Sequence, residues 1–166
     1  MKLQTIRMTT IQLFGTGRDS VTIAMHDGIG TIQQFYPKLG CMSSIRASDL
    51  NVDDFEVAVM KFGGSEVFLS VEKCKMLAKV LTKHIIDQQK LEDDYMIAQT
   101  VYLVLEEDYE KEESSEVYNS DKFTEWVNQR IFCSDFKQRL WLLQNQANQF
   151  MIKIMQFIIS HSASSW

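Results

Sequence analysis

The spacing of apolar residues changes along the chain, from every second residue near its beginning to every third or fourth residue later. Val21, Ile23 and Met25 alternate with small or polar residues, which is typical of a strand with one buried face. Residues 8–14 alternate in the same way and are rich in β-forming residues. The first part of the chain is therefore predicted to form an antiparallel sheet.

Turn residues separate the predicted strands. Gly15, Gly17 and Asp19 indicate one turn, residues 27–30 indicate a second, and Pro37 ends a strand over residues 31–36. Residues 55–62 and 66–69 flank a Gly-Gly-Ser run, which predicts a hairpin. Residues 38–54 are polar and irregular, and they are interpreted as a loop. The sheet should contain about four to five strands.

Helical spacing begins after residue 70. Ser70 is placed to cap a helix over residues 71–88, and Cys74 falls on its apolar face. Residues 95–105 favour a strand by composition and a helix by spacing, with one stripe through Met96 and another through Ala98; we prefer the helix. A short helix over 122–132 and a final long one from Ser134 should follow. The apolar stripe of the last helix is Phe136, Leu140, Leu143, Ala147, Phe150, Ile154 and Ile158.

These patterns predict an α+β fold, with an antiparallel sheet followed by a helix and then a helical part that ends in a long amphipathic helix. The strand-rich part covers residues 1–90 and the acidic, mainly helical part covers residues 91–166. We expect the two parts to pack together as one domain. A chain of 166 residues can bury enough surface to fold without a disulfide or a metal.

Motifs for chemistry are not found in the sequence. The three cysteines are far apart and form no CxxC pair, so no metal or other cofactor is predicted, and a reducing compartment is expected. His26 stands beside Asp27 without a nucleophile motif, and residues 15–20 lack both the third glycine of GxGxxG and the ending of a P-loop. The protein is predicted not to be an enzyme.

No membrane association is predicted either. The first residues lack the continuous apolar stretch of a signal peptide. The strongest apolar run covers residues 150–159, and it is shorter than the roughly 20 residues needed to cross a bilayer. A cytoplasmic location is expected.

Charge divides the chain unevenly. Residues 1–90 contain 11 Lys and Arg and 9 Asp and Glu, whereas residues 91–166 contain 6 and 13. Acidic residues crowded together repel one another, and a basic partner would relieve that repulsion. A protein-binding site is therefore predicted at Glu106, Glu107, Asp108, Glu110, Glu112 and Glu113. A solvated, purely structural segment is the alternative interpretation.

The strand-rich part suggests a different site, because cations occur there among aromatic residues. Sheets that bind single-stranded nucleic acid combine cations with exposed aromatic rings on which bases stack. The aromatic residues are Phe14, Phe35, Tyr36, Phe55 and Phe62. The site residues in this alternative are Arg7, Arg18, Tyr36, Lys38, Arg46 and Lys61. Core packing of the aromatic rings would make this pattern coincidental.

Several strands followed by a helix, joined through residues 62–72 (FGGSEVFLSVE), resemble the order of elements in PC4-type single-stranded DNA-binding modules. The resemblance covers about residues 1–88 and implies a dimeric sheet that binds single-stranded DNA. The polar stretch at 38–54 and the acidic second part depart from that pattern.

Two functions thus remain open. The favoured one is a small, non-enzymatic intracellular binding protein, an adaptor or inhibitor that resembles small phage-encoded effectors and whose partner has a basic surface. The alternative is a single-stranded nucleic-acid-binding module. A homodimer through the C-terminal helix is compatible with both functions.

Overall fold

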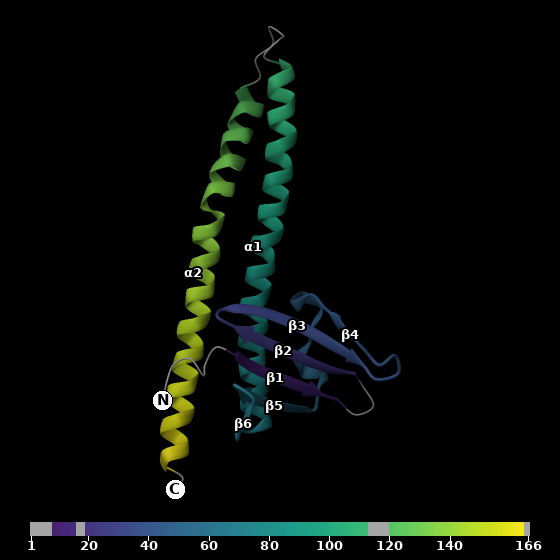
Figure 1. Cartoon of the computed structure of the whole chain (residues 1–166), viewed down its shortest axis with the longest axis vertical. Helices are drawn as coiled ribbons and strands as arrows, with labels where there is room; N and C mark the ends of the chain where they lie inside the picture. The colour runs from purple at the N-terminus through teal and green to yellow at the C-terminus, as the bar shows by residue number, and fades with distance from the viewer. Residues whose placement is uncertain (1–7, 16–18, 113–119, 165–166) are drawn as a thin grey trace. The chain divides into compact units, whose positions relative to one another are not determined.

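The computed structural model describes residues 8–15, 19–112 and 120–164 and has an α+β fold, as predicted. The strands form a single antiparallel sheet in the order β4-β3-β2-β1-β5-β6, so the sheet has six strands and not four to five (Figure 1). The elements are β1 (Met8–Phe14), β2 (Ser20–His26), β3 (Ile29–Tyr36), β4 (Cys41–Ser44), the 3₁₀ helices η2 (Ala47–Asp49) and η3 (Val52–Asp54), β5 (Val57–Phe62), β6 (Ser65–Val67), α1 (Val71–Glu112) and α2 (Ser120–Ser164).

Two tight hairpins form where the sequence predicts turns. Asp27 and Gly28 connect β2 to β3 with φ angles of 49° and 81°, and Gly63 and Gly64 connect β5 to β6 with φ angles of 54° and 88°. Positive φ at both central residues is the geometry that matches the twist of a two-residue hairpin, and Asp-Gly and Gly-Gly adopt it readily. The second hairpin is the predicted one, and the first turn is shorter than residues 27–30.

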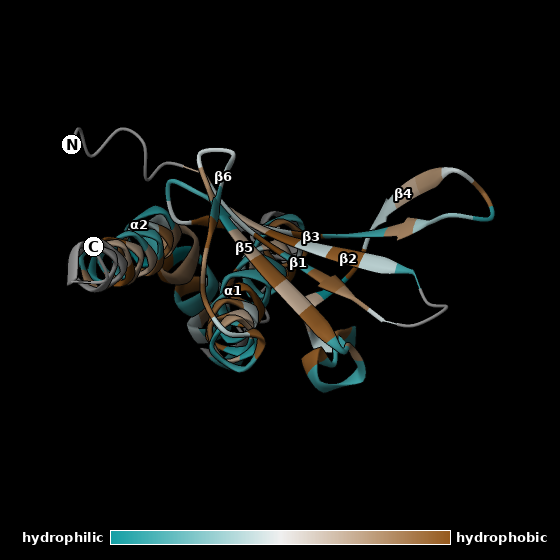
Figure 2. Ribbon diagram, turned by 90° about the horizontal axis from the view of Figure 1, so that it is seen from below, coloured by the Kyte–Doolittle hydropathy of each residue, from teal (hydrophilic) through white to brown (hydrophobic). Residues whose placement is uncertain are grey.

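Strand alternation builds a one-sided core. Ile11, Ile23, Ile32 and Met60 are buried on the same face of neighbouring strands, as their pairing requires. α1 lies against this face (Figure 2) and contributes Cys74, Ala78, Leu81 and Ile85 to the core. The residues between these positions on β1, β2, β3 and β5 point to the opposite, open face.

The start of α1 is fixed by its predicted cap. The hydroxyl oxygen of Ser70 accepts a hydrogen bond from the amide of Lys73 at 3.2 Å, which satisfies one of the amides that the first turn leaves without a helical partner. Cys74, one turn further on, is buried as predicted, and burial raises the pKa of its thiol above the ordinary value.

The predicted loop at 38–54 is wrong in part, because it contains β4 and both 3₁₀ helices. All four residues of β4 are exposed, so the strand has no apolar alternation and depends on its backbone pairing with β3. The second 3₁₀ helix begins with a local cap, since Asn51 Oδ1 accepts a hydrogen bond from the amide of Asp53.

The predicted helix breaks are also wrong. α1 continues from residue 71 to 112 and includes the ambiguous residues 95–105, and α2 continues through Ser134. Neither helix contains a glycine or a proline to interrupt it. The hydroxyl of Ser134 donates to the carbonyl of Ile131 at 2.8 Å, which satisfies this polar side chain inside the helix.

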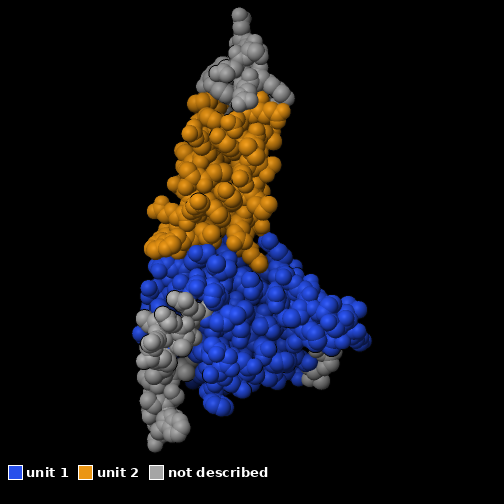
Figure 3. All heavy atoms as spheres, in the orientation of Figure 1, with its two compact units in different colours: residues 1–88, 143–166 blue, residues 89–142 orange. Residues whose placement is uncertain are grey.

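The chain divides into two compact units (Figure 3). Unit 1 comprises residues 1–88 and 143–166, and unit 2 comprises residues 89–142. Ala147, Met151 and Ile154 of α2 share the core of unit 1 with the sheet. Within the predicted stripe of α2, Ala147 and Ile154 are buried and the others are half-buried, except Ile158, whose side chain lies outside the described part.

Candidate functional site

Unit 2 is a helical hairpin held together by aromatic stacking. Tyr95 of α1 stacks on Phe136 of α2, with ring centroids 3.9 Å apart. Tyr102 stacks on Trp126 at 5.7 Å, and Ala98 is buried between these two levels of α1. These residues recur at helical spacing, so they define the side of α1 that faces α2.

The opposite side of α1 is apolar and exposed. Met96, Ile97, Leu103 and Val104 leave 66%, 62%, 57% and 53% of their surface accessible. We call this cluster, together with Thr100, the outward face of α1.

Thr100 lies in the middle of the outward face and does not make it polar. Its hydroxyl donates to the carbonyl of Met96 at 2.9 Å, so the donor group is turned back onto the helix backbone. The outward face is therefore continuous in its apolar character between residues 96 and 104.

Carboxylates border the outward face at both ends. Asp93 precedes it by one turn, and Glu107 follows it by one turn. Glu107 also lies near the C-terminal end of α1, where the helix dipole disfavours negative charge.

Only part of the predicted acidic site can be placed. Glu106 is half-buried and Glu107 is exposed. Asp108, Glu110 and Glu112 belong to α1, but their side chains lie outside the described part, and Glu113 lies outside the described residues altogether. The structure thus links the start of the acidic run to an apolar surface. The sequence did contain the Met96, Thr100 and Leu103 spacing, although it could not indicate which stripe of the helix is exposed.

The predicted nucleic-acid residues do not gather on one surface. Lys61 is on the open face of the sheet, whereas Tyr36 follows the register of the opposite face, where its hydroxyl donates to Gln34 Oε1 at 3.2 Å. Lys38 and Arg46 are exposed in the connections after β3 and β4. Arg7 and Arg18 lie outside the described residues.

Two other aromatic residues do occupy the open face. Phe14 and Phe35 are 40% and 38% exposed. Phe35 pairs with Ser20 of β2, and Phe14 follows Leu13, which pairs with Val21 beside Ser20. Phe55 is buried, and Phe62 follows the core-facing register. Successive residues of a strand point to opposite faces of the sheet, so Phe35 and its neighbour Tyr36 lie on different faces.

Two histidine side chains of unit 1 are described, those of His26 and His84. His26 and Asp27 are exposed side chains 3.8 Å apart. Burial lowers the pKa of His84 below its ordinary value, and the nearby charge of Asp87 opposes that shift. The described residues contain no group of three or more histidines, cysteines and acids that could hold a metal ion.

Comparisons with known proteins identify no relative. No protein family matches the chain, and neither the curated proteins nor the solved structures contain a significant match. The resemblance to PC4-type modules therefore stays a prediction from the order of elements. In the part of the chain that is described, no helix has both the length and the apolar character needed to cross a bilayer.

Proposed function

We propose that this protein is a non-enzymatic protein-binding adaptor that acts in the cytoplasm and docks a basic, amphipathic segment of its partner on α1. The observation that carries the proposal is the exposure of Met96, Ile97, Leu103 and Val104 between acidic ends. A helix that is apolar on two opposite sides is normally covered on both of them. Exposed apolar clusters with a polar border are typical of protein-interaction surfaces.

The acidic border selects the partner. A basic helix could place apolar side chains on the outward face and bring Lys or Arg near Asp93 and Glu107. A second copy fits this face less well, because an antiparallel pair of α1 helices centred on Thr100 would bring Asp93 opposite Glu107. The acidic run after residue 107 would accelerate association with a basic partner by electrostatic steering.

The test compares three forms of the full chain in affinity capture from the native host, with quantitative mass spectrometry and nucleic-acid detection on the same eluate. The first is the wild type, and the second is Met96→Gln with Leu103→Gln. The third is a matched control, Leu39→Gln with Met42→Gln, which removes two exposed apolar residues from the β3–β4 hairpin. Circular dichroism verifies that all three remain helical.

We expect one protein with a basic amphipathic segment to be lost from the α1 variant and retained by the control. A synthetic peptide of that segment should bind the wild type directly, more weakly as salt rises. Equal retention by both variants would refute docking on the outward face.

A second candidate function is single-stranded nucleic-acid binding on the open face of the sheet, favoured by Phe14, Phe35 and Lys61 there. Fluorescence anisotropy with a labelled oligonucleotide at low salt tests it. Phe35→Ala should cost about 1–3 kcal/mol of binding if a base stacks on the ring. Tyr36→Ala is the matched control, because its ring follows the other face. No binding at micromolar protein would exclude this function.

A homodimer through α2 remains part of the proposal, since Ile131, Trp141 and Leu142 are exposed along that helix. Analytical ultracentrifugation measures it directly. The dimer should dissociate in the double variant Ile131→Gln with Leu142→Gln if α2 forms the contact.

A further inference from the structure

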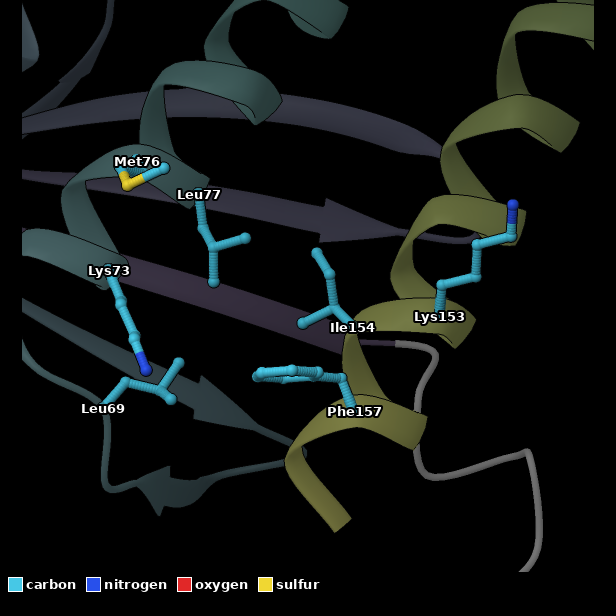
Figure 4. Close-up of a pocket in the computed structure, with 7 residues that line it drawn as sticks. All are labelled: Leu69, Lys73, Met76, Leu77, Lys153, Ile154 and Phe157. Carbon is cyan, nitrogen blue, oxygen red and sulfur yellow. The ribbon is translucent and has the colours of Figure 1, made fainter. Parts of the chain in front are cut away.

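An apolar groove lies in unit 1, between the first turns of α1 and the part of α2 around Ile154 (Figure 4). Its volume is about 330 Å³, which is in the range of small binding sites. The lining residues are Leu69, Lys73, Met76, Leu77, Lys153, Ile154 and Phe157. Five of them are apolar, and the other two are lysines.

The walls of the groove are open to a ligand. Met76 and Phe157 leave 65% and 49% of their surface exposed, while Leu77 and Ile154 are more buried and lie between them. Figure 4 shows the Phe157 ring extending from α2 toward Leu69. Phe68, the residue before Leu69, is 93% exposed.

The two lysines flank the groove from different helices. Lys73 extends from α1 beside Leu69, and Lys153 extends from α2 on the other side of the groove (Figure 4). Neither ammonium group has an acidic partner among the residues that the structure describes. Lys79, which is also on α1, differs, because its Nζ lies 2.8 Å from Asp53 Oδ1.

We propose that this groove binds a short acidic segment of a protein partner. An apolar side chain of that segment would enter between Leu77 and Ile154, and carboxylates on either side of it would pair with Lys73 and Lys153. Charge complementarity supports an acidic occupant, since no acidic residue lines the groove. A peptide is favoured over a fatty acid because one carboxylate could reach only one of two ammonium groups on opposite sides.

This site goes beyond the proposed function, because it lies in unit 1 and has the opposite charge to the outward face of α1. An adaptor with both sites would accept a basic segment and an acidic segment from different partners. The two sites share no residue, so variants of one leave the other unchanged.

Selection of a random 12-residue peptide library displayed on phage against the full chain tests the groove. We expect the enriched peptides to carry an aromatic or long aliphatic residue flanked by Asp or Glu. Labelled copies should bind with an affinity that falls as salt rises. Lys73→Glu with Lys153→Glu should weaken them about tenfold or more, because both charge contacts become repulsive.

The matched control is Lys83→Glu with Lys137→Glu, which makes the same charge change on the same helices outside the groove. This control should bind the enriched peptides within about twofold of the wild type. Equal weakening by both double variants, or enriched peptides without acidic residues, would overturn the proposal. Failure to enrich any peptide would also overturn it. A different result would be that the fluorescent fatty acid cis-parinarate binds the wild type and the control but not the groove variant. That result would overturn the peptide proposal and assign the groove to a small anionic amphiphile.

Discussion

Tyr95 and Phe136 stack across unit 2 with their ring centroids 3.9 Å apart and their planes 18° apart. Because Tyr95 points toward α2, its neighbour Met96 points away from it and is exposed. The stack therefore fixes the rotation of α1 about its axis, and with it the direction of the outward face.

Removing this stack should loosen unit 2. Phe136→Ala should lower the free energy of unfolding by about 2–3 kcal/mol, since a half-buried aromatic side chain and a stacked pair are both lost. Denaturant unfolding of Tyr95→Ala, of Phe136→Ala and of the double variant gives the coupling free energy between the two rings. Strict additivity of the two single effects would mean that the rings do not stabilise each other.

Neutralising the acidic run should slow partner binding without disturbing the fold. The variant carries Glu106→Gln, Glu107→Gln, Glu110→Gln and Glu113→Gln. Helix stability should stay equal or rise slightly, because negative charge near the C-terminal end of a helix is unfavourable. Stopped-flow mixing with the basic segment of the captured partner should show a slower association rate, and the difference from wild type should fade at high salt. An association rate insensitive to both changes would mean that the run is only a solubilising segment.

The stability of unit 1 should depend on the protonation of His84. Burial lowers the pKa of His84 in the folded protein, whereas the unfolded chain keeps the ordinary value of about 6.5. In the pH range between these two values the unfolded state binds more protons, so stability falls as the pH is lowered through it. Below the folded-state pKa the penalty becomes constant. His84→Gln should remove this slope in melting curves taken from pH 8 to pH 5, and an unchanged slope would assign it to other groups.

The thiols should differ sharply in reactivity. Cys41 is exposed on β4, whereas Cys74 is buried and has a raised pKa, so it is protonated and inaccessible. Brief treatment with iodoacetamide followed by mass spectrometry should label Cys41 in the native protein and Cys74 only after unfolding. Labelling of both at the same rate would contradict the packing of α1 on the sheet.

Gly30 should tolerate no side chain. Its amide donates to Gln88 Oε1 at 3.3 Å, and a Cβ there would overlap Ile85 Cγ1. Gly30→Ala should cost about 1–3 kcal/mol of stability through overpacking. Gly40→Ala is the control, because its Cβ would meet nothing within 4 Å and only its positive φ opposes the change, at about 1 kcal/mol. Equal melting temperatures for the two variants would show that α1 can move away from β3.

Local signals account for the elements that the sequence predicted. β1 and β2 alternate strictly, Gly63 and Gly64 supply positive φ, and Ser70 caps α1. β4 lacks such a signal, since its four exposed residues are held by the backbone of β3. The β-branched and aromatic composition of residues 95–105 favoured a strand and obscured the continuity of α1, whose Tyr95 stacks on Phe136 of α2.

The candidate sites depended more strongly on tertiary structure. Two stripes of α1 were visible in the sequence, but the stacking of Tyr95 and Tyr102 on aromatic residues of α2 decides that Met96 is on the exposed side. The groove combines residues more than 75 positions apart, such as Leu77 and Ile154. Periodicity within one helix carries no information about which distant helix will lie beside it.

The discontinuity of unit 1 has a consequence for protein synthesis. Leu81 and Ile85 share a core with Ala147 and Met151, and all of unit 2 is made between them. At about 5–20 residues per second, the ribosome needs roughly 3–13 s to add the intervening residues. During that interval the sheet and the first turns of α1 lack the segment of α2 that completes their core. The unfinished chain therefore exposes apolar residues that chaperones and proteases can bind until α2 has been synthesised.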